Sequence, residues 1–408
     1  MIKVEDKEQC SGCSACCQVC PKECITMQAD EEGLLYPSVN QNLCVNCHRC
    51  EHVCPILEGV IEKDEPLTYA GYNKCENERE VSSSGGIFTL IAKYIIEQGG
   101  VVFGAAFNES FEVEHIRVER SEELSKLRGS KYVQSRVGNI YKEVQEFLNN
   151  ERIVLFTGTP CQIGGLLSYL TKEYKNLYTQ DIVCHGVPSP MVWSRYVKYR
   201  KKSASSSIDN ITFRSKNNGW ANYHVQFEFS NNTKYSQVHT SDLYLRAFLR
   251  KLTLRPSCYA CHFKGTRRVA DITLGDFWGI ENVVPELDDN KGTSLVLCNT
   301  EKGKQLFDNI CSQVEYCEVD YVEAMRYNPA AIHSVKQPGS RDIFMKAIRH
   351  GRFDKCVEIY CNEEGKYDKW IQFREDIESV KRDKGAVFAT VWSVKNFGKT
   401  LISKNKRL

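Results

Sequence analysis

The clustering of the cysteines limits what this chain can fold into more than any other feature does. The chain of 408 residues contains 20 cysteines, and ten of them lie between Cys10 and Cys54. Residues 10–21 read CSGCSACCQVCP and residues 44–55 read CVNCHRCEHVCP, so the spacing C-x2-C-x2-C-x3-C-P occurs twice. Bacterial ferredoxins hold two 4Fe–4S clusters with this spacing. The repeat therefore predicts a small ferredoxin-like dicluster domain over residues 1–60.

The order of the cysteines also predicts which thiolates share a cluster. Three thiolates in a tight loop can reach three irons of one cube, and the fourth cysteine, which precedes a proline, is carried to the other cube. The first cluster site then consists of Cys10, Cys13, Cys16 and Cys54, and the second cluster site of Cys44, Cys47, Cys50 and Cys20. Two zinc knuckles are the alternative, but zinc sites use paired CxxC motifs that close with four ligands. Cys17 and Cys24 lie off the pattern, and we expect them to be small buried hydrophobes.

Composition and charge exclude several classes of protein. The first residues, MIKVEDKEQC, contain no apolar segment of an export signal, so the many cysteines indicate metal ligation or redox chemistry rather than disulfides. No apolar run approaches the roughly 20 residues that span a bilayer. We therefore expect a cytoplasmic protein without a transmembrane segment. The 54 Lys and Arg residues nearly balance the 52 Asp and Glu residues, which argues against a nucleic-acid partner.

The charge is distributed unevenly along the chain. Residues 1–58 contain four Lys or Arg and nine Asp or Glu, so the predicted module is acidic and the rest of the chain is basic. Solvated faces of both signs are the simpler explanation. Docking of the acidic module onto the body, or onto a redox partner, is the alternative.

The rest of the chain has the pattern of a larger α/β body with a mixed sheet. Apolar strands alternate with amphipathic helices, and we expect a helix at 86–98 and strands at 101–107, 112–118, 153–157, 177–184, 223–229, 269–276 and 293–299. We divide the body into residues 67–150 and 151–335, followed by a helical tail over 336–408, with a loop expected at 201–207. Neither GxGxxG after a strand nor GxxxxGK[ST] occurs, so the common nucleotide-binding signatures are absent.

Four further cysteines lie near the ends of expected elements. Cys161 lies between a strand and a helix in FTGTPCQ, Cys184 ends a strand in DIVCHG, and Cys258 and Cys261 form the motif CYAC. Together they could hold a third cluster from distant segments. Taken singly, Cys161 could be a nucleophile of low pKa at a helix N-terminus, and the CxxC motif could bind zinc or act as a redox dithiol. The spacing alone leaves these alternatives open.

Six segments of the body occur in an order that one known family shares. They read SSSGGIFTLIAKYI, LRGSKYVQS, FTGTPCQIGGL, DIVCHG, RPSCYACHFKGTRRVADITLGDFWG and KGTSLVLCNTEKG. Over about residues 67–335 the chain therefore resembles the family of coenzyme F420 (deazaflavin) hydrogenase/dehydrogenase beta subunits. The resemblance implies an iron–sulfur flavoprotein that binds FAD and holds a third 4Fe–4S cluster on Cys161, Cys184, Cys258 and Cys261. Plant-type reductases that act on a chlorophyll intermediate resemble the same body, so the family does not fix one substrate.

Two strips of residues are candidates for binding the flavin. The candidates are Ser83, Ser84, Gly85, Gly86, Gly129, Ser130, Lys131, Tyr132 and Thr159. The SSSGG segment opens the expected helix, where free N–H groups and the helix dipole suit a pyrophosphate; a plain serine N-cap is the alternative. Lys131 could contact a phosphate or the edge of the flavin ring, or it could be an ordinary surface lysine. Thr159 is expected to shape the loop around the cluster or the flavin.

We therefore expect an FAD-dependent iron–sulfur oxidoreductase. Its electrons would come from a ferredoxin-like or other low-potential donor, pass through the clusters to FAD, and reach a small-molecule or carrier substrate. His185, which follows Cys184, is a candidate proton donor, although it could equally hydrogen-bond to a cluster sulfur or pack in the core. The alternative function is a non-catalytic electron-transfer subunit of a larger redox complex.

Overall fold

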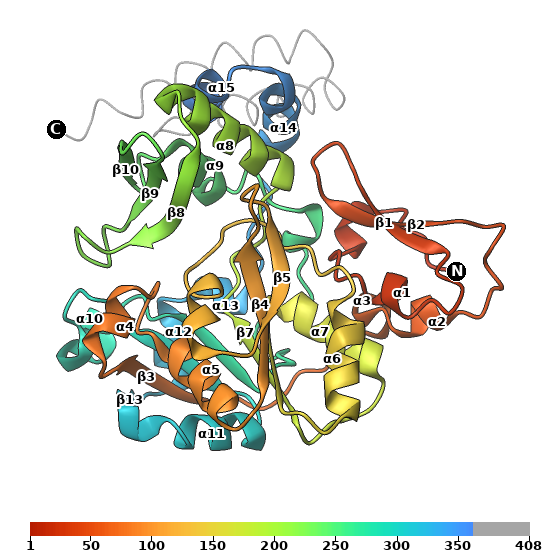
Figure 1. Cartoon of the computed structure of the whole chain (residues 1–408), viewed down its shortest axis with the longest axis horizontal. Coiled ribbons are helices and arrows are strands. Elements are labelled where there is room, and N and C mark those ends of the chain that lie inside the picture. Colours follow the sequence, from red (N-terminus) through yellow and green to blue (C-terminus); the bar gives the residue numbers. More distant parts are fainter. Residues whose placement is uncertain (362–408) are drawn as a thin grey trace, which may run out of the picture.

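The computed structural model describes residues 1–361, which form a small N-terminal module beside a larger body (Figure 1). The module contains the antiparallel strands β1 (Ile25–Ala29) and β2 (Leu35–Val39) and the short helices α1 (Ala15–Gln18), α2 (Arg49–His52) and α3 (Pro55–Glu58). The two cysteine loops share one backbone turn, since Ser14 and His48, equivalent positions of the repeat, both adopt left-handed φ angles of 68° and 59°. The repeat in the sequence is therefore also a repeat in the backbone.

A sheet of eight strands forms the core of the body. Its strands are β3 (Leu67–Asn73), β4 (Val101–Phe107), β5 (Val113–Val118), β6 (Val154–Thr157), β7 (Leu177–Ile182), β11 (Ile272–Asp276), β12 (Ser294–Cys298) and β13 (Val314–Glu318). They lie in the order β13-β3-β12-β11-β7-β6-β4-β5. The central strands β11, β7, β6 and β4 are parallel, and each of the outer strands β12, β3, β13 and β5 pairs antiparallel with its neighbour. The expected mixed sheet is therefore present.

Helices cover both faces of this sheet. They are α4 (Glu76–Glu80), α5 (Ile87–Glu97), α6 (Ile140–Asn149), α7 (Pro160–Leu170), α10 (Ile280–Val283), α11 (Glu301–Asp308), α12 (Tyr321–Arg326) and α13 (Pro329–Ile332). Val102 of β4 packs with α5 and α11, whereas its neighbours Val101 and Phe103 pack with α6 and α7. Successive side chains of a strand point to opposite faces, so these helices lie on opposite sides of the sheet.

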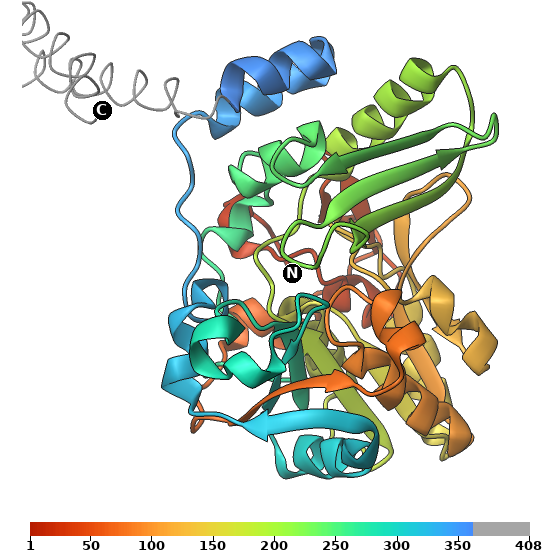
Figure 2. The ribbon, with the colours of Figure 1, turned by 90° about the vertical axis from the view of Figure 1, so that its left-hand side faces the viewer.

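A second, smaller lobe lies above the large sheet (Figure 2). It contains the antiparallel strands β8 (Ile208–Ser215), β9 (His224–Phe229) and β10 (Lys234–Val238), with the helices α8 (Pro190–Ala204), α9 (Leu243–Leu249), α14 (Arg341–His350) and α15 (Phe353–Tyr360). One apolar cluster, which includes Trp193, Phe227 and Phe344, joins these elements. The lobe therefore combines two separate parts of the chain. The elements from α8 to α9 precede β11, and the helices α14 and α15 follow β13.

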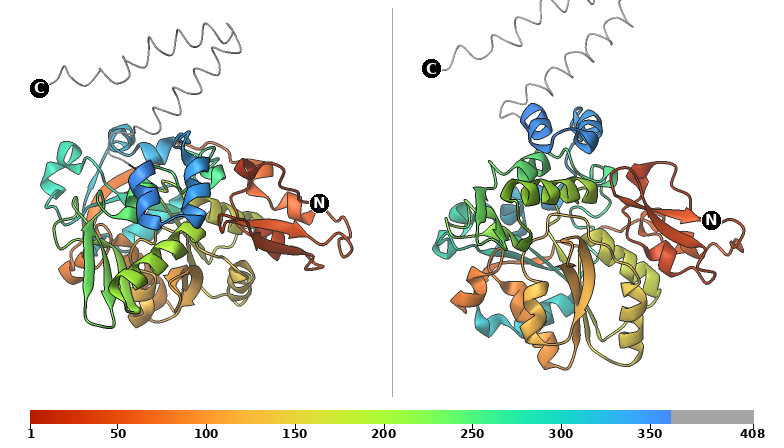
Figure 3. Two further views of the ribbon diagram at one scale, coloured as in Figure 1. Left: turned by 90° about the horizontal axis from the view of Figure 1, so that it is seen from above. Right: turned by 45° about the horizontal axis from the view of Figure 1, so that its top comes forward.

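The N-terminal module packs directly onto the body, and the views from two further directions agree on this (Figure 3). Gly165 of α7 faces Cys13, and a Cβ atom at residue 165 would lie only 2.7 Å from the Cβ atom of Cys13. Glu32 of the module forms an ion pair of 2.5 Å with Arg341, a side chain that is only 4% exposed. Exposed acidic residues also pair with basic residues of the body, as in Glu31–Arg349 and Glu23–Lys142. The acidic module therefore docks onto the body.

Most expected strands are confirmed, and the differences have local causes. The strands at 101–107 and 223–229 agree with β4 and β9 to within one residue. The expected loop at 201–207 is wrong for its first half, because Lys201, Lys202 and Ala204 favour helix and continue α8. The helix ends at Ser205, which has a left-handed φ of 50°. Helices α14 and α15 lie in the expected helical tail, and residues 362–408 lie outside the described part of the chain. No helix within residues 1–361 is long and apolar enough to cross a membrane.

Candidate functional site

The four thiols predicted for the first cluster site lie together. Burial, with smaller contributions from the neighbouring Cys10 and Cys54, raises the pKa of the Cys13 thiol to about 11. Burial also raises the pKa of the Cys16 thiol, and Cys13, Cys10 and Cys54 again contribute to the shift. Thiols of high pKa bind iron only when the metal displaces their protons, so cluster assembly here releases protons.

The second cluster site lies at the surface of the module. Its four predicted ligands, Cys20, Cys44, Cys47 and Cys50, line one small cavity. Cys47 is exposed to solvent. Cys24 is buried beside this site, with its Sγ atom 3.3 Å from that of Cys20, and the Cys17 thiol donates a hydrogen bond to the carbonyl of Ile25. Both cysteines outside the repeat therefore pack near the ligands.

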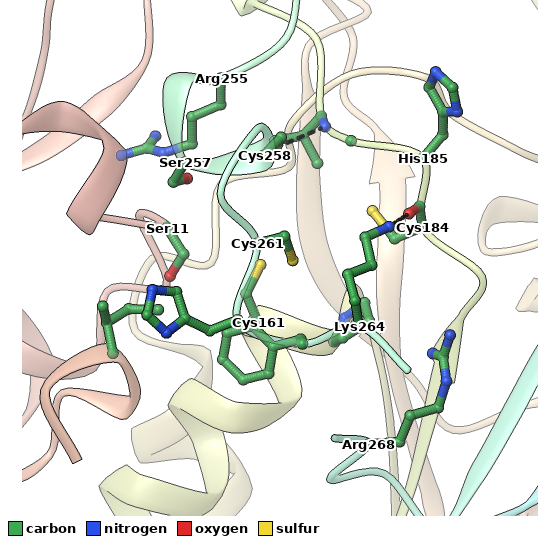
Figure 4. A pocket seen from close by; sticks show the side chains of 16 residues that line it. Ser11, Cys161, Cys184, His185, Arg255, Ser257, Cys258, Cys261, Lys264 and Arg268 are labelled. Carbon is green, nitrogen blue, oxygen red and sulfur yellow. Dashed lines mark hydrogen bonds between the residues drawn. The ribbon is translucent and has the colours of Figure 1, made fainter. Parts of the chain in front are cut away.

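Another cavity, of about 30 Å³, is lined by Cys161, Cys184, Cys258 and Cys261 (Figure 4). We call it the third cavity, because these are the cysteines expected to hold the third cluster. Cys161 lies in the first turn of α7, whose start is fixed by a capping box between Thr159 and Gln162. Cys184 follows the end of β7, and the other two thiols lie on the turn after Arg255 and Pro256. The fold thus brings together the four dispersed cysteines that the resemblance implies for a third cluster. Ser11 and Ile56 of the module complete the wall.

Buried cations surround these four thiols. Arg255, Lys264 and Arg268 all line the cavity, and each is at most 7% exposed. Lys264 donates hydrogen bonds to the carbonyls of Cys184 and Ala330, and Arg268 lies 3.5 Å from the buried carboxylate of Asp181. Buried charge is costly unless it is compensated.

The buried cations Arg255, Lys264 and Arg268 outnumber the buried carboxylate of Asp181, so the wall of the third cavity carries net positive charge. A 4Fe–4S cluster held by four thiolates is an anion, so both the donor set and the surrounding charge fit such a cluster. No group of three or more His, Cys, Asp or Glu side chains within residues 1–361 converges closely enough to hold a single metal ion.

A larger cavity of about 310 Å³ opens at the carboxyl ends of the parallel strands. Thr157, Ile182 and Asp276 mark where β6, β7 and β11 reach it. Ligands of open α/β sheets bind at this edge, and the volume is in the range of ligand sites. The two candidate flavin strips and Thr159 line the cavity, except for Gly85. Gly85 packs instead against the main chain, where a Cβ atom would lie 2.6 Å from the carbonyl oxygen of Gly71.

Hydrogen bonds join the two candidate strips to each other. The main-chain N–H and the hydroxyl of Ser130 both lie within hydrogen-bonding distance of the Ser83 hydroxyl, at 2.7 Å and 2.9 Å. Ser84 donates its hydroxyl to the carbonyl of Thr293, so this side chain has a structural partner. The strips therefore form one continuous wall of the cavity.

The start of α5 has donors to offer a bound phosphate. Gly86 is its N-cap, with φ 83°, and no side chain caps the helix. The first N–H groups of a helix have no partner within the helix, and the dipole there favours an anion. The N-terminus of α5 therefore fits a phosphate-bearing cofactor better than it fits a plain serine N-cap.

Lys131 lines this cavity and is partly buried. Its ammonium group donates hydrogen bonds of 2.9–3.2 Å to the carbonyls of Leu127, Arg128 and Gly129. Burial lowers the pKa of Lys131 to about 7. Near this pKa the ammonium group is only partly charged at neutral pH, and a bound anion would favour its charged form.

His185 lies in the wall of the third cavity and does not line the larger one. Its ring makes an edge contact with Phe248, and burial lowers its pKa to about 4. The imidazole is therefore neutral at neutral pH. Its predicted part in proton transfer stays a prediction.

The structure also identifies residues that the sequence did not indicate. Arg214 forms a bidentate ion pair at 2.9 Å and 3.1 Å with Asp276, which lines the larger cavity, and it donates a hydrogen bond of 3.3 Å to the carbonyl of Ser83. Arg255 reaches from the third cavity into the module. The sequence could have pointed to Arg255 only through its position directly before Pro256 and the CYAC motif. Arg214 lies in β8, where no motif marks it.

The third cavity and the larger cavity adjoin each other. The hydroxyl of Thr159 lies 3.2 Å from the sulfur of Cys161, and Thr159 itself lines the larger cavity. Val187 lines both cavities. The sites therefore follow one another from the surface of the module into the body: second cluster site, first cluster site, third cavity and larger cavity.

Comparison with known proteins identifies the class first. A 4Fe–4S dicluster domain matches residues 9–56, so the chain is an iron–sulfur redox protein. The N-terminal and C-terminal domains of the coenzyme F420 hydrogenase/dehydrogenase beta subunit match residues 68–142 and 151–324. The chain belongs to this family of beta subunits, with the dicluster domain in front.

Individual relatives are more distant. One subunit of the F420H2 dehydrogenase of Methanosarcina mazei is 25% identical over 335 residues, which cover 78% of this chain and 87% of that one. The coenzyme F420-dependent sulfite reductase of Methanocaldococcus jannaschii is 27% identical over 192 residues, which cover 46% of this chain and 29% of that one. The F420-reducing [NiFe] hydrogenase complex of Methanosarcina barkeri contains a chain that matches with a TM-score of 0.45 and 17% identity, covering 66% of this chain and 93% of that one.

Proposed function

We propose that the chain is an iron–sulfur flavoprotein oxidoreductase. Electrons from a low-potential donor would pass through three 4Fe–4S clusters to FAD and then to a two-electron substrate. The observation that carries the proposal is the order of the sites, because the exposed Cys47 lies at one end of the series and the larger cavity at the other. When bound, a flavin exchanges single electrons with clusters and electron pairs with organic substrates.

The residues of the larger cavity have distinct tasks in this proposal. The open N–H groups at the start of α5 would bind the pyrophosphate of FAD, and Ser83 would orient the loop that carries Ser130. Lys131 would lie next to an anionic group of the cofactor, which would favour the charged form of the lysine, since its own partners are neutral carbonyls. Thr159 would fix the distance between the third cluster and the cofactor, because it contacts Cys161 and lines the cavity.

The substrate proposal rests on the relatives. Two of them are named for coenzyme F420, one as part of an F420H2 dehydrogenase and one as an F420-dependent sulfite reductase. The deazaflavin is therefore the first two-electron partner to test, as an oxidant or as a reductant.

A second candidate function is a non-catalytic electron-transfer subunit of a larger redox complex. The observation that favours it is that the Methanosarcina mazei relative is itself named as one subunit of a dehydrogenase. Such a chain would hold its clusters without reacting with any small molecule.

Anaerobic purification of the full chain separates these functions. The oxidoreductase proposal predicts about 12 irons per chain, at four per cluster, together with extractable FAD that a reduced ferredoxin bleaches. Replacing the exposed ligand in Cys47→Ser should slow this bleaching, whereas Cys17→Ser, a cysteine outside the ligand sets, should leave it unchanged. Protein that retains its clusters but contains no flavin would overturn the flavoprotein proposal and support the electron-transfer subunit.

A further inference from the structure

Arg255 is a fully buried arginine at the junction of the module and the body. Its Nε atom donates to the carbonyl of Cys10 at 2.7 Å, and one terminal nitrogen donates to the carbonyl of Leu35 at 3.0 Å. The other terminal nitrogen donates to the side-chain oxygen of Gln134 at 3.1 Å. The guanidinium lies over the ring of Tyr36, 4.2 Å from the ring centre. These oxygen acceptors are all carbonyl or amide oxygens, so they leave the charge of the guanidinium uncompensated.

The same guanidinium touches a ligand of the first cluster site. The nitrogen that binds Leu35 also donates toward the Sγ atom of Cys10, at 3.6 Å. The loop leaves room for it at Gly12, where a Cβ atom would lie 2.7 Å from the guanidinium. Hydrogen bonds to the ligand sulfurs and nearby charge are two of the factors that set the potential of an iron–sulfur cluster.

The main chain of Arg255 belongs to the third site. Its carbonyl accepts a hydrogen bond from the N–H of Cys258 at 2.9 Å, and its N–H donates to the carbonyl of Val187 at 2.9 Å. The N–H of Val187 in turn donates to the Cys258 sulfur at 3.4 Å. Figure 4 shows the side chain leaving this turn in the direction of the module. Arg255, which lies 245 positions after Cys10 in the sequence, thus contacts the ligand loops of both sites.

We propose that Arg255 is a positioning and potential-setting residue between the first and third clusters. Its guanidinium stabilises the reduced state of the cluster on Cys10, and its main chain holds Cys258. Reduction adds one negative charge to a cluster, and a fixed cation in a buried site favours the more negative state. The cation therefore makes the first cluster easier to reduce. This inference rests on the cluster assignments of the proposed function.

The test is an anaerobic redox titration of the full chain, in which electron paramagnetic resonance follows each cluster. Arg255→Gln removes the charge, and the reduction equilibrium of the first cluster should shift at least tenfold toward the oxidised form, about 59 mV for one electron. Arg255→Lys restores the charge and should recover most of the shift. Arg341→Met is the matched control, because Arg341 also joins the module to the body but binds Glu32 and no cysteine. Its first-cluster potential should stay at the wild-type value.

A second variant covers the case in which Arg255→Gln fails to retain its iron. Gln134→Glu keeps Arg255 in place and sets a carboxylate where the amide oxygen now lies, 3.1 Å from the guanidinium. It should lower the potential of the first cluster in the same direction.

The outcomes separate this inference from the proposed function. An unchanged first-cluster potential in Arg255→Gln or Gln134→Glu, with about 12 irons retained, would overturn the role of Arg255. A shift of equal size in Arg341→Met would also overturn it, since weakened docking alone would then be the cause. Wild-type protein without a third cluster would instead overturn the proposed function.

Discussion

The cluster sites of the module and the cysteine site of the body are built in opposite ways. The module takes its eight predicted ligands from residues 10–54, on two loops with the same backbone turn. The body takes four thiols from three segments between Cys161 and Cys261, and it surrounds them with buried cations. A local loop places its thiolates through spacing alone. A dispersed site exists only after the strands and helices that carry it have packed.

The largest expected effect separates the two kinds of site. The double variant Cys258→Ser and Cys261→Ser should lose the third cluster completely, so the iron content should fall from about 12 to about 8 per chain. The module should keep its two clusters, because none of its ligands comes from the body. Iron and acid-labile sulfide analysis of the full chain measures this, with Cys17→Ser as the control. A loss of all iron would mean that the module depends on the third site after all.

The next variant concerns the crossed ligation within the module. Cys54→Ser removes the one ligand of the first cluster site that comes from the second loop, so signals of the first cluster should weaken while those of the second remain. The module should also lose stability, since so small a domain depends on its metal. Electron paramagnetic resonance of the reduced protein distinguishes the two clusters. Equal loss from both clusters would argue against the crossed assignment.

A smaller effect is expected at the contact between the two regions. Glu32→Gln leaves the buried Arg341 with only the exposed carboxylate of Asp342, and breaking a buried pair costs about 3 kcal/mol. Glu62→Gln is the matched control, because its pair with Arg267 spans 3.6 Å and is largely exposed, and exposed pairs contribute about 0–1 kcal/mol. Chemical denaturation gives both values. Equal effects would show that the module docks without help from the buried pair.

The last effect, and the smallest at any single pH step, is a change in how stability depends on pH. The pKa of Lys131 is lowered to about 7 from its ordinary 10.5, so between these values the unfolded chain holds a proton that the folded chain has released. Stability should therefore rise with pH over this range, by at most about 1.4 kcal/mol per pH unit. Lys131→Met should flatten this rise, and the exposed Lys126→Met should leave it as it is. Denaturation of cofactor-free protein at pH values from about 7 to about 9.5 measures the slope, and an unchanged slope in Lys131→Met would contradict the assignment.

The same contrast explains what the sequence could predict. The repeat around Cys10 and Cys44 predicts its own ligand pairing, because cluster ligation is set by short spacings. Strands such as β4 and β9 follow from local apolar patterns. The cavity of Cys161 and Cys258 required a family resemblance, since no local pattern joins positions so far apart in the chain. The three-stranded lobe and the contacts of Arg255 could not be predicted, because they depend on how separate elements pack.

The glycine at the contact of module and body has a consequence for kinetics. Gly165 lets the loop of Cys13 lie directly on α7, so the module and the body are held at a fixed separation within one chain. Two separate proteins would first have to meet by diffusion, whereas joined modules face each other at a constant effective concentration. Electron transfer from the module to the body should therefore be first order and independent of dilution. Exchange with an external donor at the exposed second site, and with a substrate at the larger cavity, would remain collisions between molecules.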